Sequence, residues 1–250
     1  MTTAKITTKV SGLANPQQFM AASAWALPAA GALALLLFVI GLPWGLHYSP
    51  PDYQQGESVR IMYIHVPAAW WSMGIYAAMA GASFTYLVWR HVLADVAARA
   101  MAPIGAAYAG LCLATGSLWG RPTWGAWWEW DARLTSMLVL FLTFIGYVAL
   151  RAATDEDERG ARLGAVLALA GAINLPIVHY SVEWWSTLHQ PASILREGGS
   201  GIHPSMIGPL FTMAGAYAAA FVALTLASMR ADIYRRRTRA AQARRARSSP

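Results

Sequence analysis

Residues 27–46 read LPAAGALALLLFVIGLPWGL, a run of twenty residues without a charged side chain. A helix needs about 20 apolar residues to cross the hydrocarbon core of a bilayer, so this run predicts a transmembrane helix. Further runs of the same kind follow, and the expected spans cover residues 24–46, 61–89, 100–119, 134–151, 162–180 and 204–229. The runs are continuous and do not alternate as barrel strands do. The sequence therefore predicts an all-α polytopic membrane protein, a bundle of six transmembrane helices with a Trp-rich outer loop.

The composition supports a single integral membrane domain over residues 1–250. Hydrophobic residues make up 56% of the chain and charged residues 12%, about half of the roughly 25% that is typical of soluble domains. The chain has one Cys, which excludes an internal disulfide framework and a four-Cys metal site.

The basic residues predict the orientation of the bundle. Fifteen of the nineteen Lys and Arg fall on one side of the expected spans, at positions 5, 9, 90, 99, 151, 159 and 162 and in the tail from 230 to 247. Because Lys and Arg are enriched in cytoplasmic connections, we expect both termini in the cytoplasm and a multi-pass protein of the bacterial inner membrane. We interpret the basic tail, residues 230–250, as a topology anchor near anionic lipid. Nucleic-acid binding is the weaker interpretation, since no folded domain accompanies this tail.

Tryptophan is concentrated toward the opposite, outer side, which holds ten of the twelve Trp. An interfacial aromatic belt is the simpler explanation, but such belts occur at both faces of a membrane. The densest segment, residues 119–133, reads WGRPTWGAWWEWDAR. Gly120, Pro122 and Gly125 favour a shaped loop over a simple helix extension. Indole rings are large and flat and stack on flat partners, so this segment predicts a platform for a large planar apolar ligand.

Two histidines flank the Trp-rich segment in the sequence. His65 lies at the outer start of the second span and His189 lies in the third outer segment. A lone His near a membrane surface is most often a satisfied polar residue, but two beside such a platform can take both axial positions of a haem iron. His179 is the reserve candidate, with a packing or hydrogen-bonding role favoured. The remaining histidines are His47 and His203, expected at the surface, and His91, expected on the inner side.

Few outer cations are available to pair with the propionates of a haem. Arg suits carboxylates, and the candidates are Arg60, Arg121 and Arg133. Arg133 has an alternative role, in which it pairs with Asp131 and locks the end of the Trp-rich segment to the fourth span.

The Trp-rich segment also carries a family resemblance. The pattern Trp119-Gly120-x-x-x-Trp124-Gly125-x-Trp127-Trp128-x-Trp130-Asp131-x-Arg133-Leu134-Thr135 resembles the "WWD" signature of the haem-handling proteins of cytochrome c biogenesis. The number of spans, the flanking histidines and the chain length resemble one branch, the CcmC family of haem-handling (haem exporter) proteins of the cytochrome c maturation system. Further similar stretches are residues 52–56, 60–70, 101–105 and 174–190, so the resemblance covers roughly residues 45–190.

The resemblance implies a haem-handling role at the periplasmic face. It implies non-covalently bound b-type haem with His65 and His189 as axial iron ligands. By position, it places Trp119, Trp124, Trp127, Trp128, Trp130, Asp131 and Arg133 in the haem-handling loop, residues 119–133. It also implies three sets of partners: the haem chaperone CcmE, the small subunit CcmD and the ABC-type pair CcmA and CcmB. The chain has no Gly-x-x-x-x-Gly-Lys-Ser/Thr motif, so we expect a transfer protein that is not an enzyme, with ATP hydrolysis in a partner.

Other classes remain open at this point. A b-type cytochrome or quinol-linked electron-transfer subunit would place paired axial His on facing helices within the membrane. A permease for another flat amphiphile would show no haem spectrum. The larger WWD-type haem lyases have considerably longer chains with more spans.

Overall fold

The computed structural model describes residues 15–154, 158–190 and 201–248. The helices in these ranges are α2 (Pro16–Pro43), α3 (Met62–Trp89), α4 (Val92–Trp124), α5 (Ala132–Ala153), α6 (Glu158–Ala172), α7 (Asn174–Trp184) and α8 (Pro204–Ser248). A π-helical turn, Trp44–Tyr48, continues α2, and a 3-10 helix, Glu57–Ile61, precedes α3. Beyond helices, the described ranges hold only an isolated bridge between Asp52 and Gly56. The predicted all-α class is confirmed. Lys5 and Lys9, expected on the cytoplasmic side, and Arg196, expected on the outer side, lie outside the described residues.

Within the described ranges, five helical segments are long and apolar enough to cross a membrane: Pro16–Tyr48, Val92–Trp124, Ala132–Ala153, Glu158–Trp184 and Pro204–Arg239. The fourth of these combines α6 and α7, which are interrupted at Ile173. Pro176 explains this break, because it has no N–H to offer the carbonyl of Ala172. The sixth long helix, α3, has 28 residues and is not among the five. Its polar side chains Ser72 and Ser83 are buried inside the protein, so α3 needs less hydropathy than a lipid-facing helix.

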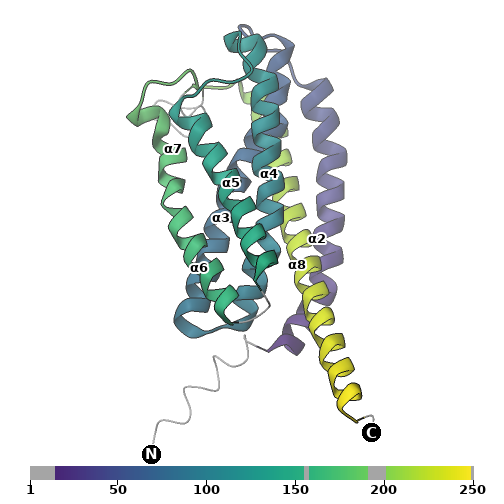
Figure 1. Cartoon of the computed structure of the whole chain (residues 1–250). Coiled ribbons are helices and arrows are strands. Elements are labelled where there is room, and N and C mark those ends of the chain that lie inside the picture. Colours follow the sequence, from purple (N-terminus) through teal and green to yellow (C-terminus); the bar gives the residue numbers. More distant parts are fainter. Residues whose placement is uncertain (1–14, 155–157, 191–200, 249–250) are drawn as a thin grey trace, which may run out of the picture.

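The helix α3 lies at the centre of the bundle. It packs against α4, α6 and α8, while α2 runs along α8 at one side (Figure 1). Its Ile75, Tyr76 and Met79 are fully buried. Glycines let the neighbouring helices approach closely. A Cβ on Gly171 would lie 2.0 Å from the Tyr76 hydroxyl, and one on Gly105 would lie 2.2 Å from the Phe144 ring.

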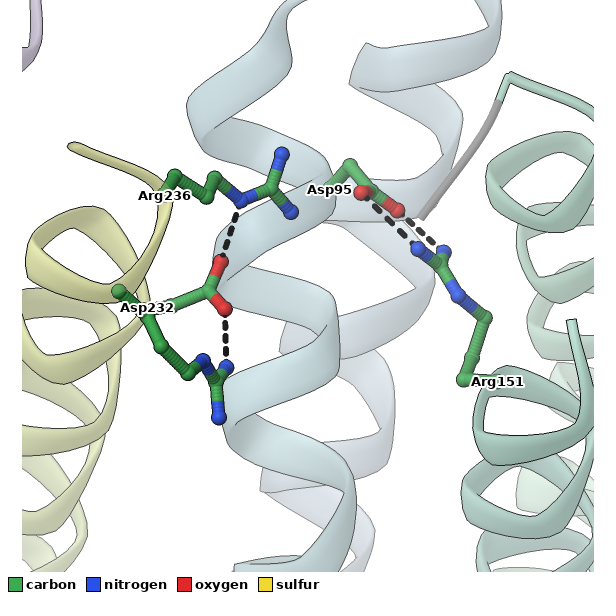
Figure 2. A network of polar contacts seen from close by, with 5 residues as sticks. Asp95, Arg151, Asp232 and Arg236 are labelled. Carbon is green, nitrogen blue, oxygen red and sulfur yellow. Dashed lines mark hydrogen bonds and ion pairs between the residues drawn. The ribbon is translucent and has the colours of Figure 1, made fainter. Parts of the chain in front are cut away.

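Charged side chains meet at the end of the bundle where α2 begins and α8 ends. Figure 2 shows Arg151 of α5 bonded through both terminal nitrogens to Asp95 of α4. The two side chains are only 5% and 9% exposed, and a buried charge requires such a partner. On α8, Asp232 pairs with Arg235 and with Arg236, as Figure 2 shows. The residues expected as a basic tail continue α8 as helix to Ser248.

The contact of Gly105 with Phe144 gives a test of the packing. Gly105→Ala places a methyl group where the Phe144 ring lies, so we expect the free energy of unfolding to fall by about 1–3 kcal/mol, the usual cost of overpacking. The matched control is Gly146→Ala on α5, since a Cβ there meets nothing within 4 Å. Unfolding in mixed detergent–SDS micelles measures both. Equal stability of the two variants would contradict the packing described here.

Candidate functional site

His65 is held by the α3–α4 contact. Its Nδ1 lies 3.0 Å from the Cys112 carbonyl oxygen and 3.2 Å from the Thr115 hydroxyl. Because a carbonyl can only accept, Nδ1 carries the proton and Nε2 keeps a free lone pair. Gly116 makes room for the ring, since a Cβ there would lie 3.0 Å from its Cε1 atom. The Trp119 indole meets the imidazole edge-on, with ring centroids 5.7 Å apart. This fixed Nδ1–H with an open Nε2 is the arrangement typical of metal-binding histidines.

His189 lies in the segment that follows α7 and shows the same pattern. Its Nδ1 donates to the Gln190 carbonyl at 2.9 Å, and its backbone N–H donates to the Thr187 hydroxyl at 2.9 Å. The Trp124 ring lies beside it, with centroids 6.1 Å apart. Burial, aided by the positive charge of Arg133, lowers the pKa of His189, while the Gln190 carbonyl opposes the shift. The imidazole is therefore neutral at neutral pH, as a metal ligand must be.

The structure brings the two histidines to one end of the bundle. His189 and the Arg133 guanidinium both lie within electrostatic range of His65, and Arg133 also lies within range of His189. The start of α3, the end of α4, the start of α5 and the end of α7 meet at this end, opposite the end of α8 (Figure 1).

Arg133 connects α5 to α7. Its guanidinium donates to the His179 carbonyl at 3.0 Å and to the Ser181 hydroxyl at 3.4 Å. Asp131 caps α5 instead, since its Oδ1 accepts from the backbone N–H of Leu134 at 2.7 Å. Within the described residues, no ion pair joins Asp131 to Arg133. The second oxygen of Asp131, Oδ2, is buried without a partner.

The expectation that Gly120 and Pro122 shape a loop is wrong. Helix α4 continues through both residues to Trp124 and ends at Gly125, whose φ of +80° suits glycine. Gly120 serves close packing instead, because a Cβ there would lie 3.1 Å from the Trp124 ring. Pro122 is tolerated in the last turn because it costs only one backbone hydrogen bond near the helix end.

The five tryptophans of residues 119–133 form two groups. Trp119, Trp124 and Trp128 are half-buried, and the first two lie beside the histidines. Trp127 and Trp130 project from the irregular part of the segment and are 58% and 76% exposed. Three indoles are thus partly enclosed, two of them beside the histidines, and two are accessible from outside.

Several contacts of the site could not be predicted from the sequence. The Trp119 indole donates to the Gln55 side chain at 2.8 Å, and His65 relies on the Cys112 carbonyl. The other outer histidines hold less enclosed positions. His47, His179 and His203 are all exposed, and His179 contributes its backbone carbonyl through Arg133.

The metal-ligating side chains of the site suit an iron that is already coordinated by another molecule. No group of three or more His, Cys, Asp or Glu side chains converges in the part of the chain that the structure describes. Two imidazoles alone do not hold a bare ion in a closed site, whereas a porphyrin supplies four nitrogens and leaves two axial positions for imidazoles.

Comparison with known proteins identifies the family. Residues 9–244 match the profile of the CcmC family, described as "Heme exporter protein C". The chain belongs to the CcmC family. Its relatives include "Heme exporter protein C" of Bradyrhizobium diazoefficiens, 56% identical over 92% of this chain and 87% of the relative. The protein of the same name from Escherichia coli (strain K12) is 46% identical over 87% and 88%, and that of Paracoccus denitrificans is 42% identical over 92% and 96%. The resemblance based on the Trp-rich segment is thereby confirmed.

The Arg133 contacts give a test of how this CcmC-family chain holds its site together. Arg133→Ala removes both bonds to the end of α7, so we expect amide exchange in residues 174–190 to rise about tenfold, the equivalent of one charge-assisted hydrogen bond. Hydrogen-exchange mass spectrometry measures this. The control is Arg121→Ala, because the hydrogen bond of Arg121 is to the nearby Gly125 carbonyl and not to α7. Unchanged exchange in the Arg133 variant would show that α7 is held by other contacts.

Proposed function

We propose that this protein binds haem at the periplasmic face of the inner membrane and presents it to the chaperone CcmE for cytochrome c maturation. His65 and His189 are the axial ligands of the iron, and the Trp-rich segment lies against the porphyrin. The observation that carries the proposal is the shared state of the two histidines. Each has Nδ1 fixed by a carbonyl and Nε2 free.

Ligation by two histidines explains how haem is held without being consumed. Two imidazoles saturate the iron and restrain oxygen chemistry, so the haem remains cargo and the protein is a transfer protein and not an enzyme. His65 is fixed between helices, whereas His189 lies beyond the end of α7 in an irregular segment. His189 is therefore the ligand that releases more readily, because its hydrogen bonds are to Thr187 and Gln190 in the same segment and the Trp124 ring only packs beside it.

The residues around the histidines contact the porphyrin and pair with its propionates. The half-buried indoles of Trp119, Trp124 and Trp128 supply apolar contact to the porphyrin. Among the outer arginines that the structure describes, Arg133 is the one whose charge acts on both histidines, which favours it as the partner of a propionate. Arg60 is occupied by Glu57 and the Leu46 carbonyl, and Arg121 by the Gly125 carbonyl.

The proposed orientation follows from charge. The site lies at the end of the bundle opposite the arginine-rich end of α8 (Figure 1). Because cytoplasmic segments are enriched in Arg and Lys, we place the site in the periplasm and both termini in the cytoplasm. CcmD and the ABC-type pair CcmA and CcmB are the further partners, and ATP hydrolysis belongs to that pair.

A role in quinol-linked electron transfer fits the structure less well. Such subunits hold haem between facing helices inside the membrane, while His65 and His189 lie at one end of the bundle, and His189 is outside the helices. A permease for another flat amphiphile leaves the open Nε2 atoms without a role.

Replacing the ligands tests the proposal directly. We expect His65→Ala and His189→Ala to lose the bis-histidine absorption spectrum after haem supplementation and purification, with haem content falling at least tenfold in the His65 variant. The controls are His47→Ala and His203→Ala, which remove exposed outer histidines. Full haem content with an unchanged spectrum in both ligand variants would falsify the assignment.

The exposed indoles test presentation separately from binding. We expect Trp127→Ala and Trp130→Ala to keep their haem spectrum but to load CcmE more slowly, by about tenfold, since exposed aromatics are the common anchors of protein interfaces. Covalent haem on co-purified CcmE measures the transfer. Trp89→Ala is the control, because Trp89 is 63% exposed at the opposite end of α3. Normal loading by both loop variants would place the CcmE contact elsewhere.

A further inference from the structure

Residues 52–56, between α2 and α3, form a closed turn. Asp52 and Gly56 pair through both of their backbone groups, with N–O distances of 3.1 and 2.9 Å. Gly56 has a φ of +58° and a ψ of −137°, a conformation that favours glycine. The Asp52 Oδ1 atom also accepts from the backbone N–H groups of Gln54 and Gln55, both at 2.9 Å. The segment is therefore a hydrogen-bonded unit, which we call the Asp52 turn.

Gln55 connects the Asp52 turn to the end of α4. Its backbone is held locally, since its N–H donates to Asp52 and its carbonyl accepts from the Ser58 hydroxyl at 2.7 Å. The side-chain amide is therefore not needed to hold the turn. Its Oε1 atom instead accepts from the Trp119 indole N–H at 2.8 Å, across 64 positions of the chain. The turn thus presents one fixed acceptor to one indole of the Trp-rich segment.

The hydrogen bond to Gln55 restrains the Trp119 ring beside His65. An indole has one polar atom, the Nε1–H donor, which needs an acceptor when the ring is enclosed. Trp119 is half-buried, and its ring meets the His65 imidazole edge-on. The ring cannot turn away from the imidazole without giving up the hydrogen bond to Gln55. His65 is thereby confined by Trp119 as well as by the Cys112 carbonyl.

We propose that Gln55 is a positioning residue of the haem site, which holds the Trp119 indole beside His65 before haem binds. This inference rests on the proposed function, because it takes His65 as a ligand of the iron. Side chains that are already ordered in the free protein raise affinity, since their ordering is not paid for when the ligand binds. Gln55 acts on haem retention through Trp119 and is not itself a ligand.

The first test uses the full-length protein in detergent without haem. Isotope labelling at the indole nitrogens of Trp gives an NMR signal for each ring, and Trp119→Phe identifies the signal of Trp119. Gln55→Met keeps the length of the side chain but removes its strong acceptor, so we expect the indole proton of Trp119 to move upfield. Gln55→Glu keeps an acceptor and adds charge to it, so this proton should move downfield. A Trp119 signal unchanged in both variants would overturn the proposal.

The second test measures haem retention, by transfer of haem from the loaded protein to excess apomyoglobin. We expect haem to dissociate about fivefold faster from Gln55→Met, the equivalent of one neutral hydrogen bond, while the bis-histidine absorption spectrum is kept. Gln55→Glu should restore slow dissociation, because it restores the acceptor. Trp119→Phe removes the same hydrogen bond from the other side, so adding Gln55→Met to it should bring no further loss.

The neighbouring Gln54 provides matched controls. Its side chain is exposed, so Gln54→Met and Gln54→Glu make the same chemical changes in the same turn. Both should keep the wild-type Trp119 signal and the wild-type rate of haem dissociation. Wild-type dissociation from Gln55→Met, while His65→Ala loses its haem, would overturn the positioning role and leave the proposed function intact. Full haem content with an unchanged spectrum in His65→Ala and His189→Ala would overturn the proposed function, and the role of Gln55 at haem with it.

Discussion

The contact of α3 with α4 at His65 is the constraint on which the outer end of the protein depends. The carbonyl of Cys112 fixes the imidazole, and this requires the two helix backbones to lie close together. Gly116 allows that approach, since any larger residue would meet the ring. The same contact places Trp119 beside His65 and within reach of Gln55. Helix packing and ligand geometry are therefore one feature, because loosening the helices would release the proton-bearing Nδ1 atom.

Hydropathy predicts where the chain crosses the membrane but not where its helices end. The span expected at 100–119 is part of α4, which extends from Val92 to Trp124, and the span expected at 204–229 is part of α8. Backbone hydrogen bonding continues a helix into the polar zone, where hydropathy no longer marks it. Helix α3 shows the reverse effect, because its buried Ser72 and Ser83 lower its hydropathy although it lies at the centre.

The candidate site divides in a similar way into predictable and unpredictable parts. The sequence points to His65 and His189 because these two histidines flank the Trp-rich segment. The structure brings both to the same end of the bundle. Their hydrogen-bond partners are backbone carbonyls of Cys112 and Gln190, which every residue type offers. Arg133 donates a hydrogen bond to the carbonyl of His179 on α7, which lies 46 positions further along the chain. Pairings of this kind follow from tertiary packing alone.

The two ends of the bundle share α4 and α5, yet the packing between them argues that they act independently. Coupling between distant sites needs an element with two discrete arrangements. Between the Asp95–Arg151 pair and the histidines, the Phe144 ring packs directly on Gly105, where a Cβ would lie 2.2 Å from the ring. Phe144 is fully buried and packs against Tyr76 at 4.8 Å between ring centroids. A ring enclosed on these sides has no second position to occupy, so a change at the Asp95–Arg151 pair would not alter the histidine geometry at the other end.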